Sequence, residues 1–239
     1  MRVVKEVNVG GRLFKLHLDM EDATSQPAIF KTGKWEPKIT SFLLKNLKQG
    51  MIFIDVGAAI GWFTIIGSSL VGEGGKVIAF EPSPIRFRTL VENVKMNTDG
   101  NVECIDKAVS SENGEAYISG EDCPMYLARS RNRFKINVPI DVVTLDSFLN
   151  VRGVEKVDIV KIDVEGSELR VLKGMEQTIR NSGEIKIICE VHIPYLSRYG
   201  DSVDRLFEYM HELGLRKRRL TGGRTALVPR YLFYKEEKR

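Results

Sequence analysis

The sequence predicts an α/β protein of the Rossmann-like class, with a mostly parallel seven-stranded sheet that ends in an antiparallel C-terminal hairpin strand. Three observations support this fold class. Strand-like and helix-like segments alternate from residue 51 to residue 213, a glycine-rich turn follows the first of these strands, and two closely spaced strand-like runs end the chain. Strands separated by helix-length segments form βαβ units, and βαβ units require parallel strands.

The N-terminal part differs from this alternating pattern. Residues 3–18 contain two runs of alternating polar and apolar residues around a Gly-Gly pair, which predicts a β-hairpin that lies against the main domain. The stretch EPKITSFLLKNLKQG has apolar residues at helical spacing and a glycine stop at Gly50, which predicts an amphipathic helix. We therefore expect a hairpin extension over 1–34 and one main domain over 35–239.

The alternating segments define the expected core of the sheet. Residues 107–143 interrupt the alternation with short strand-like runs, and the final two runs are joined by TGG, which is too short for a crossover helix. These last two strands must therefore be antiparallel neighbours. The expected strands are 51–56, 76–81, 101–106, 157–163 and 184–191, and the expected helices are 61–71, 84–97, 167–180 and 201–213.

Composition limits the class of protein. The chain has 239 residues with 43% hydrophobic and 28% charged residues, which suits one globular core, and its net charge of +4 is only mildly basic. Cys104, Cys123 and Cys189 are far apart and form no C-x-x-C pair, so neither a disulfide framework nor a zinc cluster is indicated. The N-terminus lacks the apolar core of a signal peptide, and the most apolar segment, 51–71, contains Asp55. We expect a cytoplasmic protein with no membrane span.

A glycine-rich turn lies where the first strand of the alternation meets its helix, in the stretch DVGAAIG. In open parallel sheets, ligands bind beyond the carboxyl ends of the strands near such a turn. Gly57 and Gly61 let the backbone turn tightly and approach a ligand, while the new helix presents unpaired N–H groups. The same glycines would also serve a tight turn with close helix packing, so the turn alone does not identify a ligand.

Glu81 adds the second half of a binding pattern. It ends the second strand, 24 residues after Gly57, where an acid can accept hydrogen bonds from the two hydroxyls of a ribose. The glycine spacing is G-x-x-x-G, and Ala59 stands where a dinucleotide-binding turn has the glycine that admits a pyrophosphate. The expected ligand therefore has a ribose but no pyrophosphate. S-adenosylmethionine meets that description, and the antiparallel end of the sheet is typical of methyltransferases that use it.

Five stretches resemble FkbM-family methyltransferases in sequence and in order. They are FIDVGAAIGWFT, GGKVIAFEPSPIRFRTLVENVKMN, VPIDVVTLDSF, VDIVKIDVEGSELRVLKGM and IICEVH, and the resemblance covers roughly residues 35–195. It implies the class I methyltransferase form of the Rossmann-like fold, use of S-adenosylmethionine and methylation of hydroxyl oxygens. Ala59 departs from the Asn that is usual in the family, so backbone contacts are expected to replace a side-chain hydrogen bond near the methionine tail.

The resemblance also implies roles for single residues. Glu81 would hold the ribose, and Asp106 would accept a hydrogen bond from the adenine N6 unless it is a solvated strand-end acid. Glu36 would reach the ligand's ammonium, unless it only stabilises the dipole of the following helix. Asp55, Gly57 and Gly61 would shape the methionine pocket, Lys107 or Ala108 would line the adenine ring, and the full set of expected cofactor contacts is Glu36, Asp55, Gly57, Ala58, Ala59, Gly61, Glu81, Pro82, Asp106, Lys107, Ala108 and Asp163.

Acids and a histidine end the fourth and fifth strands. The stretch VKIDVEG places Asp163 and Glu165 there, and ICEVH places Glu190 and His192. An alcohol is a weak nucleophile, so we expect a base that takes its proton during methyl transfer. His192 is the first choice because its ordinary pKa is near 6.5, with Glu190 or Glu165 fixing its tautomer. Asp163 is the alternative base or an ammonium contact, and Glu168 is interpreted as an acid stabilised at a helix N-terminus.

Other functions compete with this one. The acids and the histidine also resemble a site for a divalent metal, which we do not favour. The basic stretch LRKRRLTGGR would suit an RNA methyltransferase, but we expect no appended RNA-binding domain. The missing central glycine argues against a nucleotide-binding dehydrogenase, and the polar cluster at 163–192 argues against a non-catalytic binding module. The expected acceptor is a hydroxyl of a small molecule, a glycan or a lipid, and its identity and the oligomeric state stay open.

Overall fold

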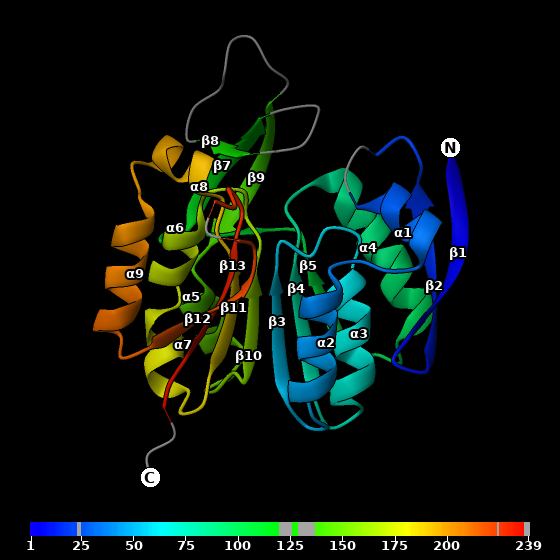
Figure 1. Ribbon diagram of the computed structural model, residues 1–239, viewed down its shortest axis with the longest axis horizontal. Coiled ribbons are helices and arrows are strands. Elements are labelled where there is room, and N and C mark those ends of the chain that lie inside the picture. The colour runs from blue at the N-terminus through cyan, green and yellow to red at the C-terminus, as the bar shows by residue number, and fades with distance from the viewer. Residues whose placement is uncertain (23–24, 120–125, 129–136, 224, 237–239) are drawn as a thin grey trace. The chain divides into compact units, whose positions relative to one another are not determined.

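A computed structural model describes residues 1–22, 25–119, 126–128, 137–223 and 225–236 (Figure 1). The chain divides into two compact units, Met1–Asp106 and Lys107–Arg239. Both units contain strands that alternate with helices along the sequence, as expected for an α/β protein. The predicted fold class is therefore confirmed, while the predicted boundary between residues 34 and 35 stays a prediction.

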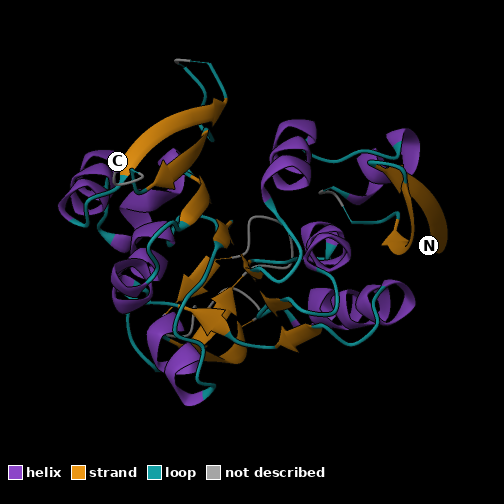
Figure 2. Cartoon of the chain, turned by 90° about the horizontal axis from the view of Figure 1, so that it is seen from below, coloured by secondary structure: helices purple, strands orange, loops and turns teal. Residues whose placement is uncertain are grey.

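The first unit begins with the predicted hairpin. Strands β1 (Arg2–Val9) and β2 (Arg12–Asp19) pair antiparallel from the pair Arg2 and Asp19 to the pair Val9 and Arg12. Gly10 and Gly11 form the turn with φ of 60° and 83°, a conformation that glycine adopts without the strain of a side chain. The hairpin lies beside helices near the labelled N-terminus in Figure 2.

Two asparagines of helix α4 (Pro84–Asn97) attach the hairpin to the rest of this unit. The side chain of Asn93 accepts a hydrogen bond from the backbone N–H of His17 at 2.6 Å, and that of Asn97 accepts one from the N–H of Lys15 at 2.8 Å. Each amide group also donates to the carbonyl of the same hairpin residue. The hairpin therefore docks through hydrogen bonds to its exposed strand edge as well as through its buried apolar side chains.

Three parallel strands form the sheet of the first unit, with β4 (Lys76–Phe80) between β3 (Ile52–Val56) and β5 (Val102–Ile105). Phe53, Ile54, Ile78 and Phe80 are fully buried, which explains why these strands are almost continuously apolar. The helices of this unit are α1 (Gln26–Thr32), which the sequence did not predict, α2 (Pro37–Asn46), α3 (Trp62–Val71) and α4.

The second unit contains a mixed sheet. Strands β10 (Ile159–Ile162) and β11 (Lys186–Glu190) are parallel, whereas β13 (Arg230–Tyr234) pairs antiparallel with both β11 and β12 (Arg216–Thr221). The predicted antiparallel C-terminal hairpin is therefore confirmed. The other main elements are the helices α5 (Leu145–Val151), α6 (Glu168–Lys173), α7 (Glu176–Asn181), α8 (Ile193–Leu196) and α9 (Val203–Glu212), with the 3₁₀ turn η1 (Ser197–Tyr199) after α8.

The single helix predicted over 167–180 is wrong, because α6 and α7 are separate helices that meet at Gly174. A side chain at Gly174 would lie 1.9 Å from the carbonyl oxygen of Ser110, so the backbone of that segment passes directly over the glycine. Asp146 then caps α7, since its carboxylate accepts hydrogen bonds from the backbone N–H groups of Gln177 and Thr178 at 2.9 and 2.8 Å. Both contacts come from segments far away in the sequence.

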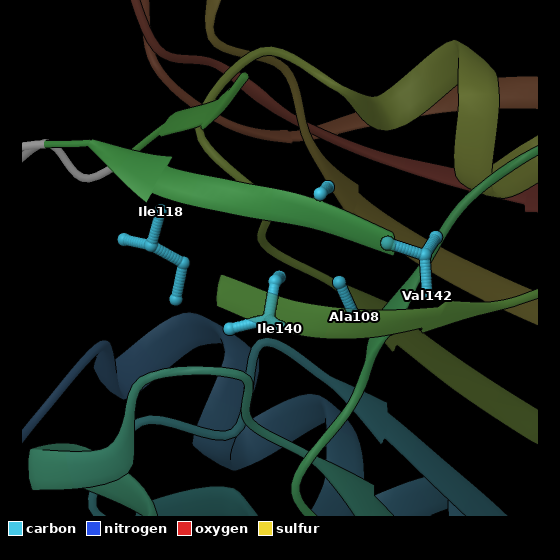
Figure 3. Packing of buried hydrophobic residues seen from close by; sticks show 5 residues of the cluster. Ala108, Ile118, Ile140 and Val142 are labelled. Carbon is cyan, nitrogen blue, oxygen red and sulfur yellow. The ribbon is translucent and has the colours of Figure 1, made fainter. Parts of the chain in front are cut away.

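The described residues between 108 and 143 contain a second, smaller sheet, with strand order β6 (Ala108–Val109), β9 (Asn137–Val143), β7 (Gly114–Ser119) and β8 (Tyr126–Ala128). Figure 3 shows side chains of this sheet gathered into an apolar cluster that includes Ala108, Ile118, Ile140 and Val142. Part of the segment 107–143, including Cys123, lies outside the described residues. Among the described residues, every helix is too short or too polar to cross a lipid bilayer.

Candidate active site

The glycine loop of the first unit joins β3 to α3 and is held against the end of β4. The N–H groups of Gly57 and Ala58 both donate to the carbonyl of Phe80 at 2.9 Å. Gly57, Ala59 and Gly61 have φ of 78°, 50° and 91°, so three of five consecutive residues adopt left-handed backbone conformations. Ala59 is the non-glycine among these three, and it holds a conformation that asparagine tolerates better than alanine does.

Glu81 lies directly after β4, and its carboxylate is oriented by backbone amides on both sides. One oxygen accepts a hydrogen bond from the N–H of Ala59 at 2.8 Å and the other from the N–H of Ser83 at 2.9 Å. The residue is only 4% exposed. A buried carboxylate with a fixed orientation at the end of a parallel strand is the arrangement that recognition of a ribose diol requires.

Two further predicted residues are tied to α3. Asp55 is fully buried, and its carboxylate accepts a hydrogen bond from the hydroxyl of Thr64 at 2.7 Å. Glu36 precedes α2 with a left-handed φ of 39°. Its segment is tied to α3 through Thr40, which accepts a hydrogen bond from the indole of Trp62 at 3.2 Å. Asp55 therefore links strand β3 to helix α3, independently of any contact with a ligand.

Asn93 is a residue of this site that the sequence did not reveal. It is fully buried, and its amide nitrogen donates to the carbonyl of Ile60 in the glycine loop at 2.8 Å, while its oxygen accepts from His17 in the hairpin. One side chain therefore connects the N-terminal hairpin, α4 and the glycine loop. Buried amides usually have such partners, but sequence spacing alone did not indicate which backbone groups they would be.

The residues predicted to face adenine have different environments. Asp106 is exposed directly after β5, and the carbonyl of the preceding Ile105 accepts the N–H of Glu81 at 3.0 Å. Lys107 forms an ion pair with Asp141. The side chain of Ala108 belongs to the apolar cluster of the small sheet. A role of Lys107 or Ala108 against an adenine ring stays a prediction and would have to compete with these contacts.

The second unit brings together the acids and the histidine that end β10 and β11. His192 follows β11 at the start of α8 and is 5% exposed. Its Nε2 lies 3.3 Å from a carboxylate oxygen of Glu165, and 3.8 Å from one of Asp163 and one of Glu190. The three acids predicted together with His192 therefore lie around its imidazole.

Glu168 is a further partner of this histidine that the sequence did not predict. Glu165 and Glu190 lie near Nε2, and the carboxylate at Nδ1 is that of Glu168, 2.8 Å away and fully buried. Glu168 does begin helix α6, as predicted, and its carboxylate also pairs with His192. In the motif DVEGSEL, an acid three residues after Glu165 is the sequence feature that could have indicated this pairing with His192. The same spacing is equally typical of a helix N-terminus.

Two cations complete the cluster. The ammonium of Lys161, itself 4% exposed, lies 3.3 Å from Asp163, and the guanidinium of Arg230 lies 2.7 Å from Glu190. Burial alone would raise the pKa of Asp163, but the charges of Lys161 and His192 outweigh that effect and lower it. Arg230 is brought to this position because β13 pairs with β11 in the register that sets it opposite Glu190.

The protonation of His192 follows from these neighbours. Burial alone would lower its pKa, but the hydrogen bond to Glu168 and the negative charges of the surrounding carboxylates outweigh burial and raise the pKa of His192 to about 9. The imidazole is therefore predominantly protonated at neutral pH. A protonated ring cannot accept a proton, so general-base action by His192 requires a deprotonation step before or during turnover.

The same cluster has the dimensions of a metal site, because ligand atoms of Asp163, Glu165 and His192 lie within 4.8 Å of one another. The imidazole, however, is engaged by carboxylates on both ring nitrogens, which suits a protonated ring better than a cation ligand. The expectation that the protein needs no metal stays a prediction.

The family model of the methyltransferase FkbM domain matches residues 55–217 of this chain. Hexuronic acid methyltransferase AglP of Haloferax volcanii is 31% identical over 159 residues, which cover 66% of this chain and 62% of that protein. The 31-O-demethyl-FK506 methyltransferase FkbM of Streptomyces tacrolimicus is 31% identical over 184 residues, which cover 62% of this chain and 67% of that protein.

Solved structures agree on the fold. A SAM-dependent O-methyltransferase of Thermotoga maritima aligns with a TM-score of 0.55 and 13% identity, covering 98% of this chain and 78% of the other. A precorrin-6y C5,15-methyltransferase of Geobacter metallireducens aligns with a TM-score of 0.52 and 13% identity, covering 93% and 94%. At this level of identity, the likeness confirms the class I methyltransferase fold and carries no information about the acceptor.

Proposed function

This chain belongs to the methyltransferase FkbM domain family, and from this premise we propose that it transfers a methyl group from S-adenosylmethionine to a hydroxyl oxygen. The proposed acceptor is a sugar, a lipid or a secondary metabolite. The names of two relatives support a metabolite or sugar acceptor, one being a hexuronic acid methyltransferase and the other a 31-O-demethyl-FK506 methyltransferase. Because the alignment spans 62% of the first relative's length, the acceptor is proposed only by chemical class.

The observation that carries the proposal is the buried, doubly oriented carboxylate of Glu81. A carboxylate has about four acceptor positions, so hydrogen bonds to backbone amides and to the two hydroxyls of a ribose are compatible. The neighbouring loop over Gly57 and Gly61 would accommodate the methionine part, since its left-handed glycines let the backbone approach a ligand. Asp106, at the end of the next strand, would be the acceptor for adenine N6. Glu36, Ala58, Ala59 and Pro82 complete the proposed contacts.

When bound, S-adenosylmethionine supplies a methyl group that is already activated by its sulfonium sulfur. The protein must then align the acceptor oxygen within about 3–3.5 Å of that carbon, exclude water and remove the hydroxyl proton. The cluster around His192 supplies groups for the last task, since His192, Asp163 and Glu165 are the members that a substrate proton would meet. Removal of the proton by a positioned base contributes roughly 10²–10⁴ in rate.

Calorimetric titration tests the cofactor assignment. We expect S-adenosylmethionine and its demethylated product to bind with micromolar affinity and NAD not to bind, because the loop lacks the glycine that admits a pyrophosphate. NAD binding without S-adenosylmethionine binding would overturn the cofactor assignment.

Transfer of a labelled methyl group tests the acceptor class. Cell extract incubated with the protein and methyl-labelled S-adenosylmethionine should yield a labelled small molecule or glycan, and mass spectrometry should place the label on oxygen. The matched control is the Glu81→Ala variant, for which we expect much less labelled product at the same cofactor concentration. Label recovered in RNA, with transfer that weakens as salt rises, would contradict the proposed acceptor class.

A further inference from the structure

The carboxylate of Glu168 is the most deeply buried acid of the His192 cluster. We propose that Glu168 is a positioning residue that holds the proton on Nδ1 of His192 and so directs Nε2 of the same ring toward Asp163 and Glu165. Glu168 itself is fully buried and would not touch a substrate, whereas the side chains of Asp163 and Glu165 are 30% and 23% exposed. Its effect on catalysis would therefore pass through the ring of His192.

Three hydrogen bonds converge on one oxygen of Glu168. This oxygen lies 2.8 Å from Nδ1 of His192, and it also accepts from the backbone N–H of Gly166 at 3.0 Å and from that of His192 at 3.4 Å. A fully buried carboxylate is strongly destabilising unless it is paired. The ring of His192 is its counter-charge, and the two amides fix the direction from which the carboxylate approaches that ring.

The plane of the ring is fixed from a second side. The rings of His192 and Tyr195 stack with an interplanar angle of 8° and centroids 6.0 Å apart. The loop that carries Glu165 packs closely against helix α8, which contains Tyr195. A side chain on Gly166 would lie 2.6 Å from Cβ of Tyr195. With Nδ1 on Glu168 and the ring face on Tyr195, the direction of Nε2 is determined.

This orientation separates the two ring nitrogens by function. Nδ1 faces a closed, buried partner, and Nε2 faces the partly exposed carboxylates at 3.3 and 3.8 Å. In the neutral ring, Nδ1–H donates to Glu168 and Nε2 can accept a proton. In the protonated ring, Nε2–H donates to Glu165 instead. The charged groups that face the ring or its partners are Asp163, Glu165, Glu168, Glu190, Lys161 and Arg230.

The catalytic consequence rests on the proposed methyl transfer. The acceptor oxygen would form its bond to the methyl carbon as the carbon–sulfur bond breaks and its electron pair stays on sulfur. The hydroxyl proton would pass to Nε2 of His192, and the resulting imidazolium would be stabilised by Glu168 until the proton leaves to solvent. The rate should therefore rise with pH toward the pKa of His192, which is about 9 in the free protein.

Nitrogen NMR of the full chain tests the orientation directly and needs no turnover. The chain has three histidines, so the imidazole signals of His192 can be assigned with the variants His17→Gln and His211→Gln. We expect the neutral ring of His192 to carry its proton on Nδ1. In Glu168→Gln, we expect the pKa of His192 to fall by about one unit or more, and the rising limb of the pH–rate profile to move by the same amount.

The matched control is Glu176→Gln, which removes an acid of α7 that is paired with Arg180 and Tyr209 outside the cluster. It should leave both the tautomer and the pKa of His192 unchanged. A neutral ring protonated on Nε2 in the wild type, or an unchanged pKa of His192 in folded Glu168→Gln, would overturn the inference. The Nδ1 tautomer in a protein that transfers no methyl group would instead contradict the proposed function and support the assignment of Glu168.

Discussion

Glu81 in the first unit and His192 in the second are both buried polar residues directly beyond strand ends, yet they are held in opposite ways. The partners of Glu81 are backbone amides from residues 59 and 83, which have a fixed protonation state. The partners of His192 are four carboxylates from three segments, and two of those carboxylates have cations of their own. The first arrangement is oriented by the main chain, whereas the second is a coupled set of charges.

The difference indicates a division of tasks. A carboxylate oriented by the main chain suits recognition, because its geometry is set before a ligand arrives. A histidine whose pKa is determined by surrounding charges suits proton transfer, because small changes in those charges change its protonation. If this comparison is right, substitutions near Glu81 should change affinity, and substitutions near His192 should change turnover and its dependence on pH.

The largest effect is expected at His192. For His192→Ala, we expect turnover to fall by roughly 10²–10⁴, because a positioned base is lost, while affinity for S-adenosylmethionine is largely retained. Steady-state kinetics and calorimetry measure the two quantities. The control is His211→Ala, an exposed histidine at the end of α9, which should behave as wild type. Full activity of His192→Ala would show that this histidine is structural and not the base.

The next effect is expected at Glu81. For Glu81→Ala, we expect affinity for S-adenosylmethionine to fall on the order of 100-fold, because hydrogen bonds to a charged acceptor contribute about 1.5–3 kcal/mol each. Glu73→Ala, which removes an exposed acid of the same unit, is the matched control and should bind normally. Unchanged affinity of folded Glu81→Ala for S-adenosylmethionine in calorimetry would show that Glu81 does not bind the ribose.

A smaller effect on stability separates two glycines. Gly61→Ala would place a side chain at φ of 91° and 2.8 Å from Leu90, so we expect about 2 kcal/mol of destabilisation and weaker cofactor binding. Gly11→Ala has a similar φ of 83° but open space around it, so about 1 kcal/mol and normal binding are expected. Denaturant unfolding measures both values. Equal losses of stability and of binding in the two variants would show that the glycine loop has no special role.

The smallest effect is expected at Asn93, whose amide reaches the glycine loop. Asn93→Ala removes the hydrogen bonds to Ile60 and His17, and we expect about 1–2 kcal/mol of destabilisation with less than a tenfold loss of cofactor affinity. Asn97→Ala removes the equivalent contacts to Lys15 one helical turn later and does not touch the loop. It should lower stability without changing affinity. A loss of affinity in Asn97→Ala as large as that in Asn93→Ala would contradict the role of Asn93.

The elements that the sequence predicted are those whose pattern is local. Strands such as β3 and β4 are continuous apolar runs, and the turn between β3 and α3 is marked by its glycines, so each is visible in a short window. The split between α6 and α7 was missed because its cause is the backbone of Ser110 passing over Gly174, and the cap of α7 comes from Asp146. Neither contact can be predicted from the residues next to position 174 in the sequence.

The same distinction holds for the candidate site. Glu81 was predicted as the ribose acceptor because the glycine turn and the strand end that precedes Glu81 lie within one βαβ unit. Three of the four carboxylates around His192, those of Asp163, Glu165 and Glu190, were predicted as candidates, whereas Glu168 was interpreted as a helix-terminal acid. Which carboxylate contacts Nδ1 depends on how the loop over 163–167 folds back on α8. Side-chain pairing of this kind depends on tertiary structure. The sequence therefore identified most of the residues of the cluster but not which atoms pair with each other.

The most direct test of the central claim is a crystal structure of the protein with S-adenosylhomocysteine. The account predicts both ribose hydroxyls within hydrogen-bonding distance of the Glu81 carboxylate and the amino-acid part against the loop that contains Gly57 and Gly61. A ribose bound elsewhere, or a diphosphate group against that loop, would contradict it.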